Sequence, residues 1–379
     1  MWAGLLWSRA LLSVSMIMFT SYALITKGKE GVEVVRSSWW LKGILLLFFL
    51  PLISGFWSDD LNEWWNVVQV KLPLLFFPFC VPVLRDLDKN IVKKMLWFLI
   101  ALVAISMTIS LADYFAMDTS DYLKAKLFKV AVYDDHVRYS WLLVVVYSWV
   151  LFELLTGNIR QKKWAVLVLV LIAIYIHVLA AKTGLIGFYL VNCLAIASLN
   201  SKFKTFFIAA LILLPLMAWF IIPSFQNRIR FVWWDFQNYS KGNYVEGLSD
   251  APRITSWKAA VEIIQEHPVL GVGAGDIIPE SKKWYAVNAP FLQEYEQLVP
   301  SNEVLLYGCY SGIIGGLVVL ITILLPFFEQ GVKRNMVWIS FHIMAGIGFM
   351  YDLALETQFG VFIYVFFGLL FYAQYRKQY

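Results

Sequence analysis

Charged side chains are scarce in this chain. Of its 379 residues, 15% are charged and 60% are hydrophobic, whereas a soluble globular domain carries about 25% charged residues. This composition excludes a soluble enzyme and a disordered chain, and long apolar runs recur along nearly the whole length. The net charge of +5 is modest, so we expect the lipid bilayer as a partner and no nucleic acid. The sequence predicts a polytopic membrane protein.

Cysteine is also rare. The three copies lie far apart, in or beside apolar stretches, at Cys80, Cys193 and Cys309. The absence of paired-cysteine and cysteine–histidine spacings excludes a disulfide scaffold and a zinc site, and no other cluster of residues requires a metal or a cofactor. The first apolar run lacks a small-residue cleavage site, so we expect a retained helix rather than a signal peptide.

Eleven apolar stretches qualify as membrane spans, because a spanning helix needs roughly 17–25 mostly apolar residues. They lie at 8–26, 40–56, 65–84, 95–115, 139–155, 164–180, 184–199, 205–222, 312–328, 335–351 and 359–375. We therefore expect an all-α fold, a transmembrane bundle of about 11–12 helices. The third stretch holds Pro73, Pro78 and Pro82, which remove helical hydrogen bonds, so we expect an irregular helix there.

Basic residues gather on one side of these spans. With the C-terminus taken as cytoplasmic, seventeen of the 31 Lys and Arg residues fall in inside segments, namely 27–42, 85–94, 157–163, 200–204, 333–334 and the chain end. Two short outside turns, 57–64 and 352–358, hold none, and short turns count most in the positive-inside rule. The long segment 223–302 is then extracytoplasmic. This alternation places the N-terminus outside and leaves the exact span count open.

The chain thus divides into three parts: a first bundle of about eight spans over 1–222, a loop over 223–302, and about three spans over 303–379. The loop is too long for an ordinary connection. Its seven basic and nine acidic residues exclude a strongly charged funnel. We expect an ordered lid of one or two short helices.

The middle of the loop carries the signals of one such helix. Asp250 and Pro252 are typical of a helix start, and Pro268 ends the helix. Apolar residues at helical spacing predict one apolar face, formed by Ile254, Trp257, Val261 and Ile264. The glycine-rich run GVGAGD follows, and glycine permits close backbone approaches.

These pieces together resemble the O-antigen ligase and polymerase superfamily. The shared pattern is R-x-x-x-W, a helix, HPVLGVGAGD, P-x-N and then SGIIG running into a helix. In this chain the pieces are Arg253 and Trp257, 267–276, 300–302 and 311–315. Further landmarks extend the resemblance to most of the chain from about residue 45: GFWSDDLNEWWNVVQVKLPLL, YDDHVRYSWLL, AAKTGLIG and LALETQFGVFIYVFFGLL.

The resemblance implies a metal-independent glycosyltransferase of the bacterial inner membrane, with the large loop in the periplasm. Such enzymes take a glycan from an undecaprenyl-pyrophosphate carrier and pass it to an acceptor hydroxyl. Ligases use the lipid A core as acceptor, and polymerases use another carrier-linked repeat. Fixed cations beside the departing pyrophosphate lower the barrier, and arginine binds two phosphate oxygens at once. We take the ligase as the leading interpretation, with the polymerase as the alternative.

Two positions depart from the family pattern. The family usually has His-Asn where this chain has Ser301 and Asn302, and Ser-Arg where it has Ala181 and Lys182. An unperturbed serine hydroxyl is no general base near neutral pH. Lysine keeps the positive charge of arginine but lacks its bidentate fork.

The resemblance implies the following roles. The residues expected to be catalytic are Arg253, Asn302, Ser301 and Glu356, and Asp276, Glu303 or Glu356 would replace the missing base. The residues expected to bind pyrophosphate or glycan are Lys182, Arg138, His136, Trp257, Asp276 and Lys71. Structural roles stay open beside these: a salt bridge within the lid for Arg253, pairing with neighbouring carboxylates for Arg138, and snorkelling for Lys182.

Two other classes of function also remain. A transporter would explain the ionisable residues inside spans, Lys71, His177 and His342, but internal repeats are common in transporters and the chain shows none. A non-catalytic relative would bind lipid-linked glycan without turnover, and Ser301 is the main argument for it.

Overall fold

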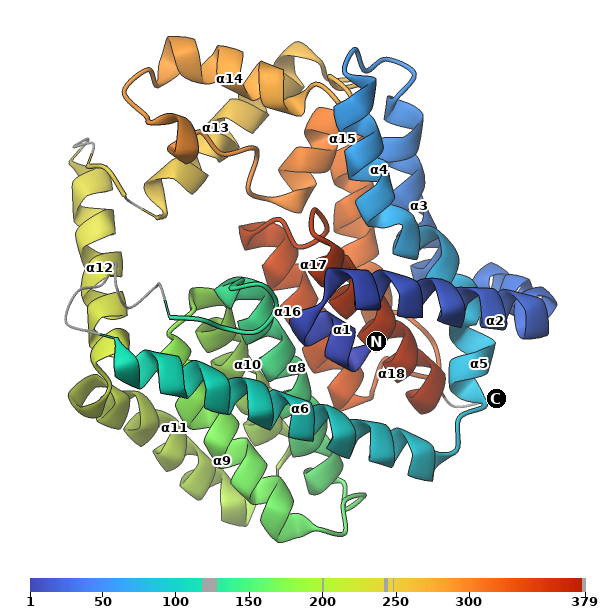
Figure 1. Ribbon diagram of the computed structural model, residues 1–379, viewed down its shortest axis with the longest axis vertical. Helices are drawn as coiled ribbons and strands as arrows, with labels where there is room; N and C mark the ends of the chain where they lie inside the picture. The colour runs from blue at the N-terminus through green and yellow to red at the C-terminus, as the bar shows by residue number, and fades with distance from the viewer. Residues whose placement is uncertain (118–127, 200, 242–244, 248, 377–379) are drawn as a thin grey trace. The chain divides into compact units, whose positions relative to one another are not determined.

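The computed structural model describes residues 1–117, 128–199, 201–241, 245–247 and 249–376, and Figure 1 shows its helices. Over these residues all regular elements are helical and no strand occurs, which confirms the all-α prediction. The chain forms two compact units. Unit 1 holds Met1–Phe19, Asp86–Phe231 and Arg334–Met344, and unit 2 holds Thr20–Arg85, Val232–Lys333 and Ala345–Tyr379.

The helices of unit 1 are α1 (Trp2–Trp7), α6 (Lys89–Ala116), α8 (His136–Leu155), α9 (Lys162–Leu179), α10 (Lys182–Ser198) and α11 (Ser201–Ile221). Those of unit 2 are α3 (Trp39–Ser54), α4 (Leu61–Phe76), η1 (Phe77–Cys80), α5 (Val81–Arg85), α13 (Ala251–Glu266), α14 (Ile277–Asn288), η2 (Glu294–Glu296), α15 (Glu303–Leu324), η3 (Leu325–Phe327), α17 (Gln358–Phe362), η4 (Ile363–Phe367) and α18 (Gly368–Tyr375). Three helices pass from one unit into the other: α2 (Arg9–Ser37), α12 (Pro223–Ser240) and α16 (Met336–Tyr351).

Each expected span coincides with an apolar helix among the described residues. Seven helical stretches are long and apolar enough to cross a membrane: Arg9–Ser37, Leu61–Arg85, Lys89–Ala116, His136–Leu155, Lys162–Leu179, Glu303–Phe327 and Gln358–Tyr375. An eighth is a pair of helices, Phe207–Ile221 and Pro223–Ser240, bent by 97°. The other three, α3, α10 and α16, have 16, 17 and 16 residues, and so reach about 25 Å at 1.5 Å per residue. The chain is a multi-pass membrane protein. Of the basic residues used for orientation, Lys377 lies outside the described part.

The predicted irregularity of the third span is confirmed. Within Leu61–Arg85, the helix α4 gives way to the 3-10 turn η1 around Pro78 before α5 continues. A second irregularity lies in α3, where Pro51 has no N–H to give to the carbonyl of Leu47. The hydroxyl of Tyr307 on α15 donates to that carbonyl instead, at 2.8 Å. In a bilayer such a replacement is required, because no water is present to satisfy the free group.

Unit 1 is built around α8, which packs against α9 and α10 and is buried along almost its whole length. Several polar groups inside it are paired with one another. Ser148 bonds Ser340 at 2.5 Å, and Tyr147 donates to Asn192 at 2.9 Å. Both ring nitrogens of His177 lie 2.7 Å from a partner, the Ala173 carbonyl and the Tyr189 hydroxyl. These contacts explain a histidine inside an apolar helix by a structural role.

In unit 2, α3 packs against both α4 and α15, and α15 is broken within the apolar stretch Glu303–Phe327. Ser311 (φ −142°, ψ 28°) and Gly312 (φ 66°, ψ −164°) leave the helical region. In an unbroken helix the Ile313 amide would donate to the Cys309 carbonyl. Here the Cys309 carbonyl accepts from Val272 at 2.8 Å, and the Ile313 amide donates to Pro268 at 3.0 Å. The expected span 312–328 therefore begins at the break.

The loop 223–302 is ordered over its described residues and contains three helices, α12, α13 and α14, rather than one or two. α13 starts at Ala251 and ends before Pro268, as predicted. The predicted apolar face is only partly buried: Ile254, Trp257 and Ile264 are half-buried, whereas Val261 is exposed. The buried positions of α13 are instead Pro252, Ser256, Ala259, Ala260 and Ile263.

Small residues explain this offset. α13 packs against α15, where a side chain at Gly308 would meet Ile264 at 2.6 Å. The thiol of Cys309 approaches the Ala260 carbonyl at 3.7 Å. Close helix packing selects small side chains at the contact, and a pattern of large apolar residues does not detect them.

We expect Gly312→Ala to destabilise the protein by about 1–3 kcal/mol. Alanine is strained at this positive φ, and its Cβ would lie 2.5 Å from the carbonyl oxygens of Pro268 and Val269. The measurement is chemical denaturation in detergent micelles. Gly28→Ala is the matched control, since nothing lies within 4 Å of its Cβ; its stability should be unchanged or higher by up to about 1 kcal/mol. Equal stability of the two variants would contradict the proposed role of the break.

Candidate functional site

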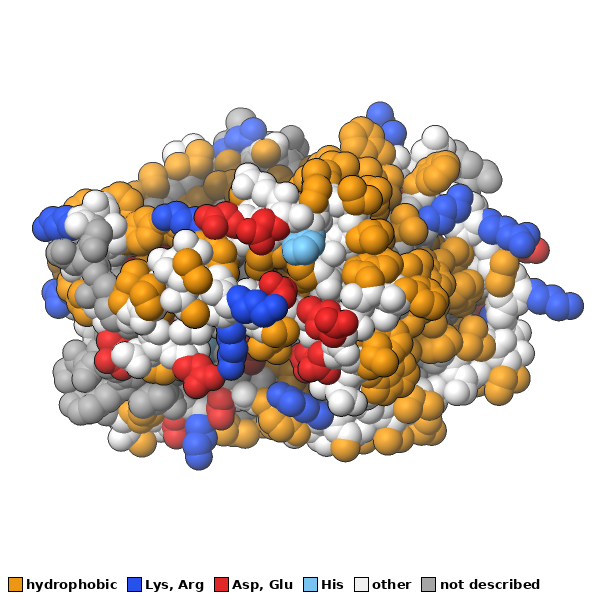
Figure 2. Space-filling model, turned by 90° about the horizontal axis from the view of Figure 1, so that it is seen from above, with side chains coloured by type: hydrophobic (Ala, Val, Ile, Leu, Met, Phe, Trp, Pro, Cys, Tyr) orange, Lys and Arg blue, Asp and Glu red, His pale blue; other side chains and the backbone are white. Residues whose placement is uncertain are grey.

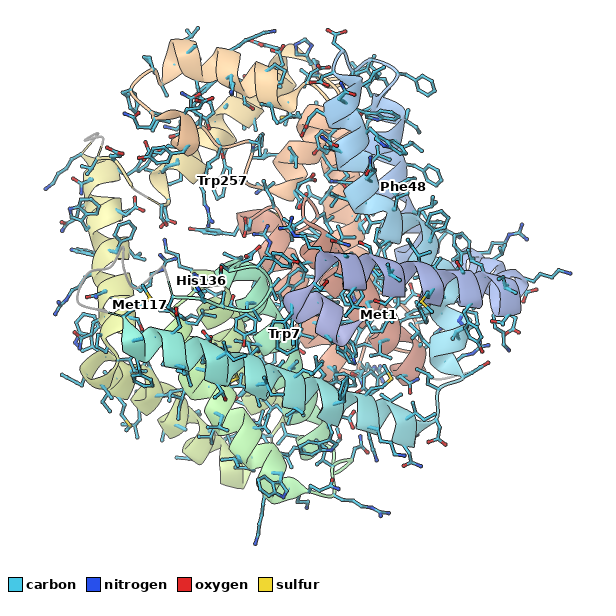
Figure 3. The ribbon with its side chains drawn as sticks, in the orientation of Figure 1. Met1, Trp7, Phe48, Met117, His136 and Trp257 are labelled. Atoms are coloured by element: carbon cyan, nitrogen blue, oxygen red, sulfur yellow. The ribbon has the colours of Figure 1, made fainter. Side chains whose placement is uncertain are left out.

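The lid helix α13 carries Arg253 and Trp257 on one side, both close to Tyr351 at the end of α16. The Arg253 guanidinium lies 5.9 Å from the centre of the Tyr351 ring, and the Trp257 ring meets Tyr351 edge-on at 5.9 Å. Figure 3 labels Trp257 on this helix. Among the described residues no carboxylate lies within ion-pair distance of Arg253. The lid salt bridge considered for this arginine is therefore not formed there.

Ser301 and Asn302 lie beside the same helix and are held by structural hydrogen bonds. The hydroxyl of Ser301 is 3.0 Å from that of Ser256, and Trp257 donates to the Ser301 carbonyl at 3.1 Å. Asn302 is the N-cap of α15: its side-chain oxygen Oδ1 accepts from the backbone amides of Val304 and Leu305 at 2.9 and 3.1 Å. Its amide nitrogen donates to the Met350 carbonyl at 2.8 Å. Only 4% of Ser301 and 6% of Asn302 is exposed.

A buried ion pair lies in the same unit. Lys71 on α4 is fully buried and is paired with Oε1 of Glu356, which follows α16. The Lys71 ammonium also donates to the Leu355 carbonyl at 3.3 Å and lies 5.6 and 5.7 Å from the rings of Tyr307 and Tyr310. The structure thus places Lys71 inside the bundle rather than at a membrane surface.

Glu303 contacts the same turn that carries Glu356. The carboxylate of Glu303 accepts from the Leu355 amide at 2.5 Å, and Glu303 directly follows Asn302. The turn 350–356 is therefore held at one end by Asn302 and at the other by Glu303 and Lys71. Near one end of this turn, Tyr351 contacts Arg253 and Trp257 of the lid. At the other end, Glu356 pairs with Lys71.

The carboxylate of Asp276 is bonded to backbone. Its two carboxylate oxygens accept from the backbone amides of Asp59 and Asp60 at 2.8 and 3.2 Å. The preceding residues of GVGAGD bond the same α3–α4 connection: Ala274 donates to Ser54 at 3.0 Å and Gly275 to Ser58 at 3.1 Å. The glycine-rich run therefore docks the lid onto the bundle.

His136, Arg138 and Lys182 belong to unit 1, at the starts of two helices that pack together. The Arg138 guanidinium lies 3.4 Å from the carboxylate of Asp135, which also caps α8. The His136 ring (Figure 3) lies 2.9 Å from the Phe128 carbonyl. Lys182 begins α10, next to Thr183, which bonds Ser140 of α8 at 3.3 Å. The structure thus brings Arg138 and Lys182 to the same end of one helix pair.

The surface of the lid carries both signs of charge, as Figure 2 shows for the face seen from above. A hydrogen bond from Lys283 to Glu280 at 2.6 Å raises the pKa of Lys283. A hydrogen bond from Lys282 at 2.8 Å lowers the pKa of Glu294. Burial raises the pKa of Tyr285, which donates to the Leu298 carbonyl at 2.9 Å. This mixture agrees with the expectation that the lid is not a funnel of one sign.

Tyr351 and Ser256 were missed by the sequence reasoning. Neither belongs to the motif that carries the resemblance, and a tyrosine at the end of an apolar span is typical of a membrane interface. The spacing of Ser256 three residues after Arg253 offers a weak signal, since it places both within one turn of the lid helix.

The fold and these groups define a class of protein: a multi-pass membrane protein whose ordered lid docks on a broken helix and holds a half-buried arginine against Tyr351, with a buried ion pair in the same unit. The family model described as O-antigen ligase matches residues 127–320. Because the match covers just over half of the chain, the chain belongs to the O-antigen ligase family. A search of curated proteins finds no match.

Membership identifies the chain as a glycosyltransferase-type enzyme that acts on polysaccharide or lipid-linked glycan. The matched region contains eight of the ten expected site residues. Lys71 and Glu356 lie outside it. The roles of all ten stay predictions.

We expect Asn302→Ala to lower stability by about 1–3 kcal/mol. The change removes the cap of α15 and leaves the Met350 carbonyl without its donor. The measurement is denaturation in detergent, with Asn288→Ala as control. Asn288 is exposed and makes one bond, to Trp284, so its loss should cost no more than about 0.5 kcal/mol. A stable Asn302→Ala variant would show that the cap contributes little.

Proposed function

We propose that this protein is an O-antigen ligase-type glycosyltransferase of the bacterial inner membrane. It takes a glycan from undecaprenyl pyrophosphate and transfers it to the lipid A core, with the loop 223–302 on the periplasmic side. The observation that carries the proposal is Arg253: a half-buried guanidinium, held over Tyr351, with no carboxylate partner among the described residues.

An arginine in this setting suits a departing pyrophosphate. Two charge-assisted hydrogen bonds from one guanidinium match two phosphate oxygens. A cation whose position is already fixed lowers the barrier without rearrangement as negative charge develops. The ring of Tyr351 and the indole of Trp257 fix the helix that carries it.

The proposal keeps the roles predicted for the other residues. Lys182 and Arg138, with His136, would bind pyrophosphate or glycan at the starts of α10 and α8. Trp257 and Asn302 act on the substrate mainly through the positions they give to Arg253 and to α15. Ser301, whose hydroxyl lies against Ser256, takes no proton.

We expect Arg253→Ala to lower glycan transfer by about 10²–10³-fold, the cost typical of losing one fixed donor to a developing charge. The measurement is transfer from carrier-linked glycan to lipid A core in proteoliposomes. Lys258→Ala is the matched control: it removes an exposed cation from the same helix, where Lys258 faces Tyr239, and transfer should stay within about twofold.

The products separate the alternatives. Attachment of glycan to lipid A core indicates a ligase, and extension of carrier-linked glycan indicates a polymerase. Movement of glycan across the bilayer that is insensitive to Arg253→Ala indicates a transporter. Binding of carrier-linked glycan without any transfer indicates a non-catalytic relative. Each of the last three results contradicts the proposal.

A further inference from the structure

The proposed transfer requires a group that accepts the proton of the acceptor hydroxyl, and three carboxylates were left open for this task. Both oxygens of Asp276 are bonded to backbone amides. Glu303 is fully buried, and one of its oxygens is fixed on the Leu355 amide. Glu356 has the largest exposed fraction of the three: 16% of its side chain, against 9% of Asp276 and 0% of Glu303 as whole residues.

Lys71 has no exposed surface, so we assign it a role other than the substrate contact that the sequence analysis predicts. Its ammonium instead holds two groups of one turn, the Leu355 carbonyl and the Glu356 carboxylate. Taking a lysine and a carboxylate out of water is expensive, and a pair of apolar residues of similar size is often as stable. Stability alone therefore does not explain this pair.

The turn also places Glu356 with respect to the lid. Tyr351, five residues earlier, lies under Arg253. Asn302 holds the Met350 carbonyl, and Glu303 holds the Leu355 amide. The arginine proposed for the pyrophosphate and the carboxylate of Glu356 are thus tied to the two ends of one short turn, and Lys71 fixes the second end.

We infer that Glu356 is the proton acceptor of the transfer and that Lys71 is the positioning residue that orients it. The inference rests on the proposed function. The acceptor oxygen bonds to the anomeric carbon while the bond from that carbon to the pyrophosphate oxygen breaks. The electron pair of the broken bond stays on the pyrophosphate, and the hydroxyl proton passes to Glu356 and then to water.

The test uses purified full-length protein in proteoliposomes with carrier-linked glycan and lipid A core. Glu356→Gln should lower kcat by about 10²–10⁴-fold, the usual contribution of a general base, and leave KM within about threefold. Lys71→Met should also lower kcat, and it should lower the denaturation midpoint because it leaves a carboxylate unpaired.

The double variant Lys71→Met with Glu356→Gln separates a chemical role from a structural one. Without charges on either side, its denaturation midpoint should return toward the wild-type value while transfer stays low. A second readout is chemical rescue: added formate should restore part of the transfer lost in Glu356→Gly, because a small carboxylate replaces the missing one. Formate should have no effect on Arg253→Ala.

Two results overturn the inference. One is near-normal kcat in Glu356→Gln, and the other is recovery of both stability and transfer in the double variant. The failure of the proposed function looks different: wild-type protein then transfers no glycan at all. If wild type transfers and Arg253→Ala does not, the proposed function stands whatever the Glu356 variants show.

Discussion

An interrupted membrane helix must satisfy its free backbone groups from elsewhere, and α15 does so with the loop that precedes it. The Cys309 carbonyl and the Ile313 amide, which would bond each other in a continuous helix, bond Val272 and Pro268 instead. Because Cys309, Ser311 and Gly312 are buried and buried backbone groups need partners, the break and the lid stabilise each other. This exchange fixes residues 268–272 against α15, and through them α13 with its arginine.

The same rule explains the prolines and the polar residues of unit 2. Tyr307 supplies the donor that Pro51 removes from α3. Asn302 caps the start of α15 and also donates to the Met350 carbonyl, and Glu303 accepts from the Leu355 amide. Two adjacent residues therefore pair backbone groups of both α15 and the turn 350–356. Most polar groups expected to touch substrate are thus also the groups that hold backbone in place. Among the described residues the Arg253 side chain has no such bond, and this is why the proposed function depends on it.

In this chain the cations proposed to bind phosphate and the carboxylate proposed to accept the proton come from different parts of the sequence. The family pattern covers the lid and the starts of α8 and α10, where the cations lie. The position at which the family usually has histidine is a serine, buried against Ser256. The carboxylate with exposed surface, Glu356, comes from the turn after α16, outside the matched region. A group that moves a proton and a group that holds a phosphate have different requirements, so they need not belong to one motif.

The sequence by itself determined the membrane class, the positions of the apolar helices, the irregular third span and the helix from 251 to 266. Each follows from local properties: long apolar runs, prolines, and the signals of helix ends. Tertiary structure decided which face of α13 is buried, that Asp276 docks the lid, and that Lys71 pairs with Glu356, 285 positions away along the chain. Those outcomes depend on small residues and on partners distant in sequence, and a periodic pattern carries information about neither.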